Sequence, residues 1–119
     1  MSYTINIINF STTIIVHLGE NKMRYFMVEG TITNANLINN DIMKEHIPYS
    51  QKAMDTGLIV MSSLKADMSG GLFIMKADST EEVNNYLCNE PLKLHGIQDY
   101  KITEFDMHYF NGSLIDTIK

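Results

Sequence analysis

The sequence predicts an α+β domain of the split β-α-β type, in which two helices cover one face of a four-stranded antiparallel sheet. The main observation is the order of its segments, which from Met23 onward read strand, helix, strand, strand, helix, strand. The length of 119 residues allows one domain with a single core. An apolar fraction of 45% is that of a folded globular chain.

The first strand and the first helix are predicted at the start of this order. Arg24–Thr33 mixes aromatic and β-branched residues as strands do, and an Asn-rich stretch at 34–40 supplies turn and cap residues. Asp41–Thr56 is predicted as a helix that Gly57 ends, with Pro48 bending or breaking it. Three apolar residues are expected to share its buried face: Ile42, Ile47 and Met54.

A hairpin and a second helix follow. Leu58–Leu64 and Leu72–Ala77 are predicted as antiparallel strands, joined by a polar loop that ends at Ser69–Gly71. Ser79 and Glu82 form a capping box that begins the second helix. The buried side of this helix is expected to carry three residues: Val83, Tyr86 and Leu87.

The second helix should end near Asn89–Pro91, because proline disfavours helical geometry in the residue before it. Ile97–Phe105 alternates into the last strand, which completes a ferredoxin-like order. One sheet face is left bare, and we expect a symmetric homodimer to bury it through the sheet faces. Alternating residues would make that face apolar: Phe26, Val60, Phe73 and Ile102.

The two ends of the chain fall outside this order. Residues 1–22 are an N-terminal extension, within which Tyr3–His17 reads as an extra strand-like segment without signal-peptide features. The domain itself is predicted over residues 23–109, and residues 110–119 form a C-terminal tail.

Composition excludes several classes of function. A net charge of −5 and a pI near 5.2 argue against nucleic acid, since phosphate binding needs a basic patch. No stretch approaches the ~18 apolar residues of a membrane-spanning helix. The single cysteine, Cys88, excludes an internal disulfide and suits a reducing cytoplasm.

A set of short motifs follows in order along the chain: Met23–Thr31, His46, Ser69–Gly71, Asn89–Leu92, Gly96–Tyr100, Ile102–Phe105 and His108–Tyr109. Together they resemble the YciI-like (YCII-related) domain over Met23–Tyr109. The resemblance implies a dimeric α+β barrel related to muconolactone isomerases and antibiotic-biosynthesis monooxygenases. It also implies an active site built on a histidine and an aspartate, in a pocket between sheet and helices.

Within this resemblance the histidine carries over to His46, and the aspartate falls on Glu90. Glu90 is one methylene longer than the aspartate of the family. Leu92 stands where an aromatic residue is usual, and Ser63-Leu64 stands where many relatives have Gly-Pro.

A histidine beside a carboxylate is suited to proton transfer near neutral pH, because the carboxylate fixes the ring tautomer and raises its basicity. His46 would move the proton, Glu90 would orient it, Ser62 would polarise a substrate carbonyl, and His95 would line the pocket rim. No metal is expected, because the histidines lack ligand spacing. No cofactor is expected either, because no dinucleotide-binding fingerprint is present.

The leading hypothesis is therefore a cofactor-independent enzyme of the isomerase or lyase type, acting on a small molecule. The alternative is a non-catalytic module that binds a small molecule or serves dimerisation alone. An enzyme needs His46 and Glu90 within hydrogen-bond reach in one cavity, a binding module needs the cavity, and a dimerisation module needs neither.

Met23 offers a second start for the chain. Relatives that share the resemblance commonly begin near this position, and Gly19-Glu20 can be encoded by a purine-rich ribosome-binding signal. Residues 1–22 would then come from the choice of start codon. N-terminal analysis of the protein made from its native gene tests this expectation, and a chain that begins at Met1 would refute it.

Overall fold

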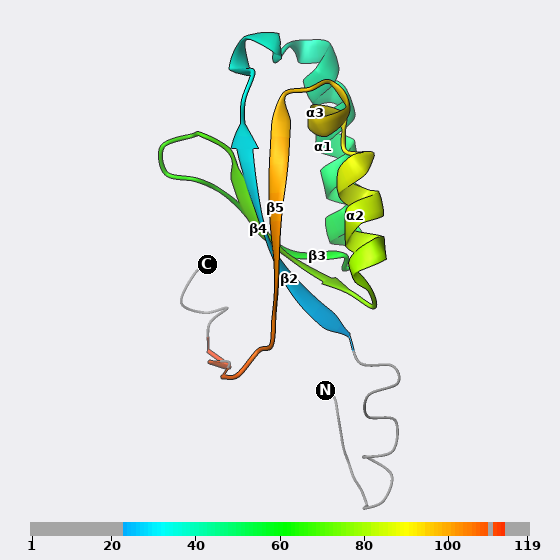
Figure 1. Ribbon diagram of the computed structural model, residues 1–119, viewed down its shortest axis with the longest axis vertical. Coiled ribbons are helices and arrows are strands. Elements are labelled where there is room, and N and C mark those ends of the chain that lie inside the picture. The colour runs from blue at the N-terminus through cyan, green and yellow to red at the C-terminus, as the bar shows by residue number, and fades with distance from the viewer. Residues whose placement is uncertain (1–22, 110, 114–119) are drawn as a thin grey trace, which may run out of the picture.

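The computed structural model describes residues 23–109 and 111–113 (Figure 1). The strand predicted at Tyr3–His17 and most of the C-terminal tail lie outside the described residues. The elements along the chain are β2 (Arg24–Ile32), the 3-10 helix η1 (Ala35–Leu37), α1 (Asn40–Asp55), β3 (Ile59–Leu64), β4 (Gly71–Ala77), α2 (Thr80–Cys88), α3 (Pro91–Leu94) and β5 (Gln98–Phe105).

The four strands form one antiparallel sheet in the order β3-β4-β2-β5, the order of a ferredoxin-like domain. β2 lies in the middle, where Val28 pairs with Phe73 of β4 and with Ile102 of β5. Figure 1 shows the helices together on one side of the sheet. The predicted order of strands and helices is therefore confirmed, and the described residues build two layers in which none of their helices covers the other face of the sheet.

The core lies between the sheet and the helices. Phe26, Val28 and Met75 are almost completely buried there, and Phe73 and Ile102 pack against them. The expectation that Phe26, Phe73 and Ile102 make the bare face apolar is therefore wrong. Residues at alternate positions of a strand share a face, and the register places these three on the helix-covered side.

The fourth residue expected on the bare face, Val60, lies at an irregularity in the pairing of β3 with β4 and is exposed. The face without helices instead presents apolar residues from the other set of alternate positions. They are partly exposed in most cases: Tyr25, Met27, Met61, Leu72, Ile74 and Phe105.

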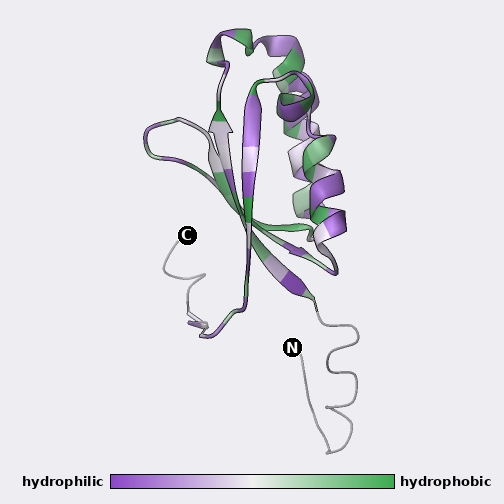
Figure 2. Cartoon of the chain, viewed as in Figure 1, coloured by the Kyte–Doolittle hydropathy of each residue, from purple (hydrophilic) through white to green (hydrophobic). Residues whose placement is uncertain are grey.

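Helix α1 begins where the Asn39 side chain accepts a hydrogen bond of 2.9 Å from the Ile42 amide. Its buried face contains Ile42 and Ala53, whereas Ile47 is 60% exposed and Met54 is 39% exposed. The predicted shared face is thus wrong for Ile47 and Met54. At 100° per residue, positions five and twelve residues after Ile42 point well away from it. Figure 2 shows the resulting mixture of hydrophobic and hydrophilic residues along the helices.

The capping box at Ser79 is confirmed in its first half. The Ser79 hydroxyl accepts from the Glu82 amide at 3.1 Å, while the Glu82 carboxylate accepts from the Asp78 amide instead of that of Ser79. α2 buries Val83 and Leu87 as expected. It ends at Cys88, and the short helix α3 that begins at Pro91 is not predicted from the sequence.

Candidate active site

His46 and Glu90 meet between α1 and the start of α3. His46 lies in the middle of α1, on the same side as the buried Ile42. Glu90 is the N-cap residue of α3, held in an extended backbone conformation (φ −70°, ψ 130°) before Pro91. Proline at the first helical position ends α2 and begins α3, so the chain turns at Glu90 and presents its side chain inward.

A small apolar cluster holds these two elements together. Ile42 of α1, Leu92 of α3 and Ile97 before β5 are buried against one another, with Ile32 and Met43 packed around them. Because the cluster joins α1 to α3, it fixes the distance between the backbones that carry His46 and Glu90.

The two side chains are in hydrogen-bond contact. His46 Nδ1 lies 2.5 Å from Glu90 Oε2. The Glu90 side chain is only 2% exposed, whereas that of His46 is 24% exposed. The carboxylate is therefore inside the protein, and the imidazole connects it to the surface.

Glu90 is provided with donors at both oxygens. Its Oε1 accepts from the Tyr100 hydroxyl at 2.5 Å and from the Leu92 amide at 3.2 Å. Burial by itself would raise the pKa of Glu90, but the hydrogen bonds from His46 and Tyr100, with the His46 charge and the Leu92 amide, hold that pKa below its usual range. The buried group is thus a carboxylate at neutral pH.

The pKa values of the tyrosines around the pair shift in the opposite direction, upward. Burial, the hydrogen bond to Glu90 and the negative charge of Glu90 raise the pKa of Tyr100 well above its usual range. Burial and the Glu90 charge also raise the pKa of Tyr49. These hydroxyls therefore stay protonated and serve as donors.

Tyr100 and Gln98 belong to the site although neither is predicted from the sequence as a site residue. Gln98 Nε2 donates to the Tyr100 hydroxyl at 3.0 Å. A signal does exist in the sequence: two polar-tipped residues at alternate positions of the last strand point to the same face, here the buried one. Buried polar groups of this kind need hydrogen-bond partners.

The two predicted substrate-binding residues are not in contact with the pair. Ser62 is exposed on β3 and lies opposite Phe73, on the helix-covered face of the sheet. His95 caps the end of α3, and its Nε2 lies 3.2 Å from Glu45 Oε1, the residue next to His46. The structure therefore joins His46 with Glu90 and leaves Ser62 and His95 at separate positions.

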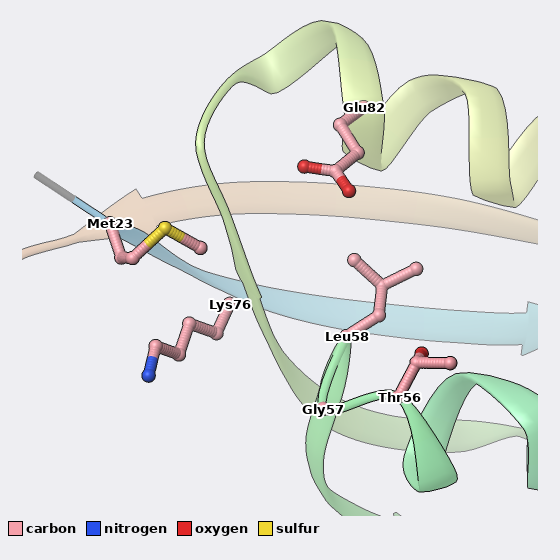
Figure 3. A pocket seen from close by; sticks show the side chains of 6 residues that line it. All are labelled: Met23, Thr56, Gly57, Leu58, Lys76 and Glu82. Atoms are coloured by element: carbon pink, nitrogen blue, oxygen red, sulfur yellow. The ribbon is translucent and has the colours of Figure 1, made fainter. Parts of the chain in front are cut away.

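One pocket lies at the C-terminal end of α1, about 15 Å from His46 along the helix axis. Figure 3 shows its lining side chains, which come from the residue before β2, the α1–β3 connection, β4 and α2. They are Met23, Thr56, Gly57, Leu58, Lys76 and Glu82. This pocket contains neither member of the pair, so it is not the cavity that the resemblance implies.

Within residues 23–109 and 111–113, no three His, Cys, Asp or Glu side chains gather as a metal site would require. None of the helices described is long and apolar enough to cross a membrane.

Comparison with known proteins supports the fold. The chain resembles the structure of 5-chloro-2-hydroxyhydroquinone dehydrochlorinase from Burkholderia phenoliruptrix, solved in complex with 2,5-dihydroxybenzoquinone, with a TM-score of 0.59 and 21% identity. The match covers 71% of this chain and 95% of that enzyme.

A second solved structure is a conserved protein of unknown function from Bacteroides thetaiotaomicron, described as a possible oxidoreductase. It matches with a TM-score of 0.46 and 7% identity, over 73% of this chain and 99% of that one. No family model matches the chain. No curated protein matches it either.

Proposed function

We propose that the chain is a YciI-like, cofactor-independent enzyme that moves a proton on a small molecule, as isomerases and lyases do. One observation carries the proposal: His46 Nδ1 lies 2.5 Å from the buried carboxylate of Glu90. A histidine oriented by a carboxylate is a general base that works near neutral pH.

The hydrogen bonds determine which nitrogen of His46 acts. An ionised Glu90 only accepts hydrogen bonds, so His46 Nδ1 carries a hydrogen and donates it. The neutral ring then keeps its lone pair on Nε2. Because the side chain is 24% exposed, this nitrogen is within reach of a bound molecule.

We further propose an enolisable carbonyl compound or a lactone as the substrate. His46 would remove the proton next to the carbonyl group, Ser62 would donate a hydrogen bond to the carbonyl oxygen, and His95 would border the site. Support at the level of the fold comes from a protein of similar structure that is named a dehydrochlorinase, although a fold by itself does not select a reaction.

The proposal includes a homodimer and a cytoplasmic location. The sheet face without helices carries apolar side chains, such as Met27 and Ile74, that a second copy would cover. A single cysteine suits a reducing compartment.

Exchange of carbon-bound protons for deuterium tests the enzyme proposal without knowledge of the physiological product. The protein is incubated in D2O with a panel of enolisable ketones and lactones, and exchange is followed by NMR. We expect the native protein to accelerate exchange of at least one compound, and His46→Asn to lower that rate by about 100-fold or more. His108→Asn, which removes a histidine outside the site, should keep the native rate.

A compound that binds but does not exchange would contradict the enzyme proposal and favour the alternative, a binding module. Equal exchange rates in the native protein and in His46→Asn would also contradict it, because the proton would then be moved by another group. Circular dichroism of each variant verifies that the fold is retained.

A further inference from the structure

The hydroxyl of Tyr100 extends the His46–Glu90 pair into the core of the sheet. We propose that Tyr100 is a positioning residue that holds the Glu90 carboxylate toward His46 and thereby keeps the imidazole in its Nδ1–H form. This inference deepens the proposed function, on which its consequence for catalysis rests. The hydrogen bonds that it describes are those of the protein without substrate.

The two carboxylate oxygens of Glu90 have different hydrogen-bond partners. Glu90 Oε2 faces His46, while Oε1 receives the Tyr100 hydroxyl at 2.5 Å and the Leu92 amide at 3.2 Å. Rotation of the carboxylate would break contacts at both oxygens together. A buried acceptor that loses a donor costs about 1–3 kcal/mol, so the donors on Oε1 keep Oε2 in place.

The two hydrogen bonds of the Tyr100 hydroxyl determine where its hydrogen points. A side-chain amide nitrogen only donates hydrogen bonds, and Gln98 Nε2 lies 3.0 Å from the Tyr100 oxygen. That oxygen therefore accepts from Gln98. Its single hydrogen is left to point at Glu90, which makes Tyr100 an obligate donor to the carboxylate.

Neighbouring residues of the sheet hold the Tyr100 ring in place. Phe73 of β4 contacts it edge to face, with ring centroids 6.1 Å apart and planes at 77°. Gly30 pairs with Tyr100 across the sheet. A Cβ atom at Gly30 would lie 2.5 Å from Gln98 Oε1 and 3.1 Å from Tyr100 Cε1. The absence of a side chain at position 30 thus leaves the space in which Gln98 and Tyr100 meet.

The titratable groups that interact with Glu90 come from α1, α2 and β5. They are His46 and Tyr49 from α1, Tyr86 from α2 and Tyr100 from β5. The Tyr49 hydroxyl donates to the Tyr86 carbonyl oxygen at 2.7 Å rather than to Glu90. Tyr49 therefore supplies a matched control, since it is another partly buried tyrosine of the same region whose hydroxyl has a different acceptor.

The experiment compares the native protein, Tyr100→Phe and Tyr49→Phe by NMR without any substrate. The 15N shifts of the His46 ring at a pH where it is neutral report its tautomer, and 13C shifts of the Glu90 carboxyl report its pKa. We expect the Nδ1–H form in the native protein and in Tyr49→Phe. In Tyr100→Phe we expect a mixture of the two tautomers and a Glu90 pKa raised by about one unit.

Two results would overturn the inference. A Tyr100→Phe variant with the native tautomer and the native Glu90 pKa would mean that the hydroxyl positions nothing. The same changes in Tyr49→Phe would mean that loss of any hydroxyl loosens the region. Because no substrate is used, the NMR result does not depend on the outcome of the deuterium-exchange test. Each of the two proposals can therefore be refuted without the other.

Discussion

Glu90 combines two roles at the scale of a single residue. Its backbone ends one helix and begins another, and its carboxylate accepts hydrogen bonds from His46, Tyr100 and the Leu92 amide. Such a group is stable in the interior only while every donor is in place, because an unpaired buried charge is costly. We therefore expect the stability of the fold to depend on the charge state of this one side chain.

The pH dependence of stability follows from the lowered pKa of Glu90. A carboxyl whose pKa is lower in the folded state stabilises that state fully above its ordinary pKa of 4.5. The contribution is lost as the pH falls through the folded-state pKa. We expect Glu90→Gln to lower the free energy of unfolding by about 2 kcal/mol at neutral pH, the size of a charge-assisted hydrogen bond. Urea unfolding at several pH values measures this difference.

The difference in stability between native protein and Glu90→Gln should narrow as the pH falls below the ordinary carboxyl pKa of 4.5 and toward the lower pKa of the folded state. Glu29→Gln is the control, because Glu29 has a lowered pKa from its ion pair with Lys65 but lies at the surface. It should change stability little at any pH. A Glu90→Gln difference that stays constant from neutral to acid pH would contradict the argument.

The sequence predicts part of this site. The residues His46 and Glu90 follow from the resemblance to the YciI-like domain, and the structure brings these two side chains into contact. Tyr100 and Gln98 are missed, because a tyrosine in a strand can lie on the buried or on the exposed face of the sheet. Only the pairing register determines which of the two faces it occupies. Contacts between residues distant in sequence depend on that register, which a single sequence does not encode in any local pattern.

At the scale of elements, the type and order of the helices and strands follow from the sequence, with boundaries within one or two residues. The local signals suffice because caps, proline and alternation act within a few residues. Which face of each element is buried was harder to predict. Ile47 and Met54 of α1 point outward, and α3 is too short for periodicity to reveal it.

The loop between β3 and β4 depends on a glycine for close backbone contact. A Cβ atom at Gly70 would lie 1.9 Å from the carbonyl oxygen of Gly30, so a backbone segment would have to move. We expect Gly70→Ala to lower the free energy of unfolding by about 2 kcal/mol or more. Thermal unfolding followed by circular dichroism measures the effect.

The neighbouring Gly71→Ala is the matched control for this prediction. Its Cβ would meet only the Ser63 carbonyl oxygen, at the ordinary contact distance of 3.5 Å. We expect its stability to stay within about 0.5 kcal/mol of the native value. Equal stabilities of the two variants would show that the approach of Gly70 to Gly30 imposes no constraint.

At the scale of the whole molecule, the described helices lie on one face of the sheet, and no helix of residues 23–109 and 111–113 covers the other (Figure 1). Met27 of β2, Ile74 of β4 and Met61 of β3 follow one another across that free face, because the register pairs Ile74 with both of its neighbours. The sequence predicts a bare apolar face but wrongly assigns Phe26, Phe73 and Ile102 to it, since strand alternation alone does not say which set faces the helices.

The homodimer proposed for this face predicts a specific response to charge. Ile74 lies in the row of apolar residues on the free face, so a lysine there would have to be desolvated between two sheets. We expect Ile74→Lys to weaken dimerisation by about 100-fold or more and to leave the monomer folded, because Ile74 is only partly buried and lies outside the core between the sheet and the helices. Light scattering coupled to size-exclusion chromatography measures the mass.

Leu94→Lys, at an exposed position of α3, should remain as dimeric as the native protein. A native chain that runs as a monomer, or an Ile74→Lys variant that keeps the dimer mass, would refute the use of this face.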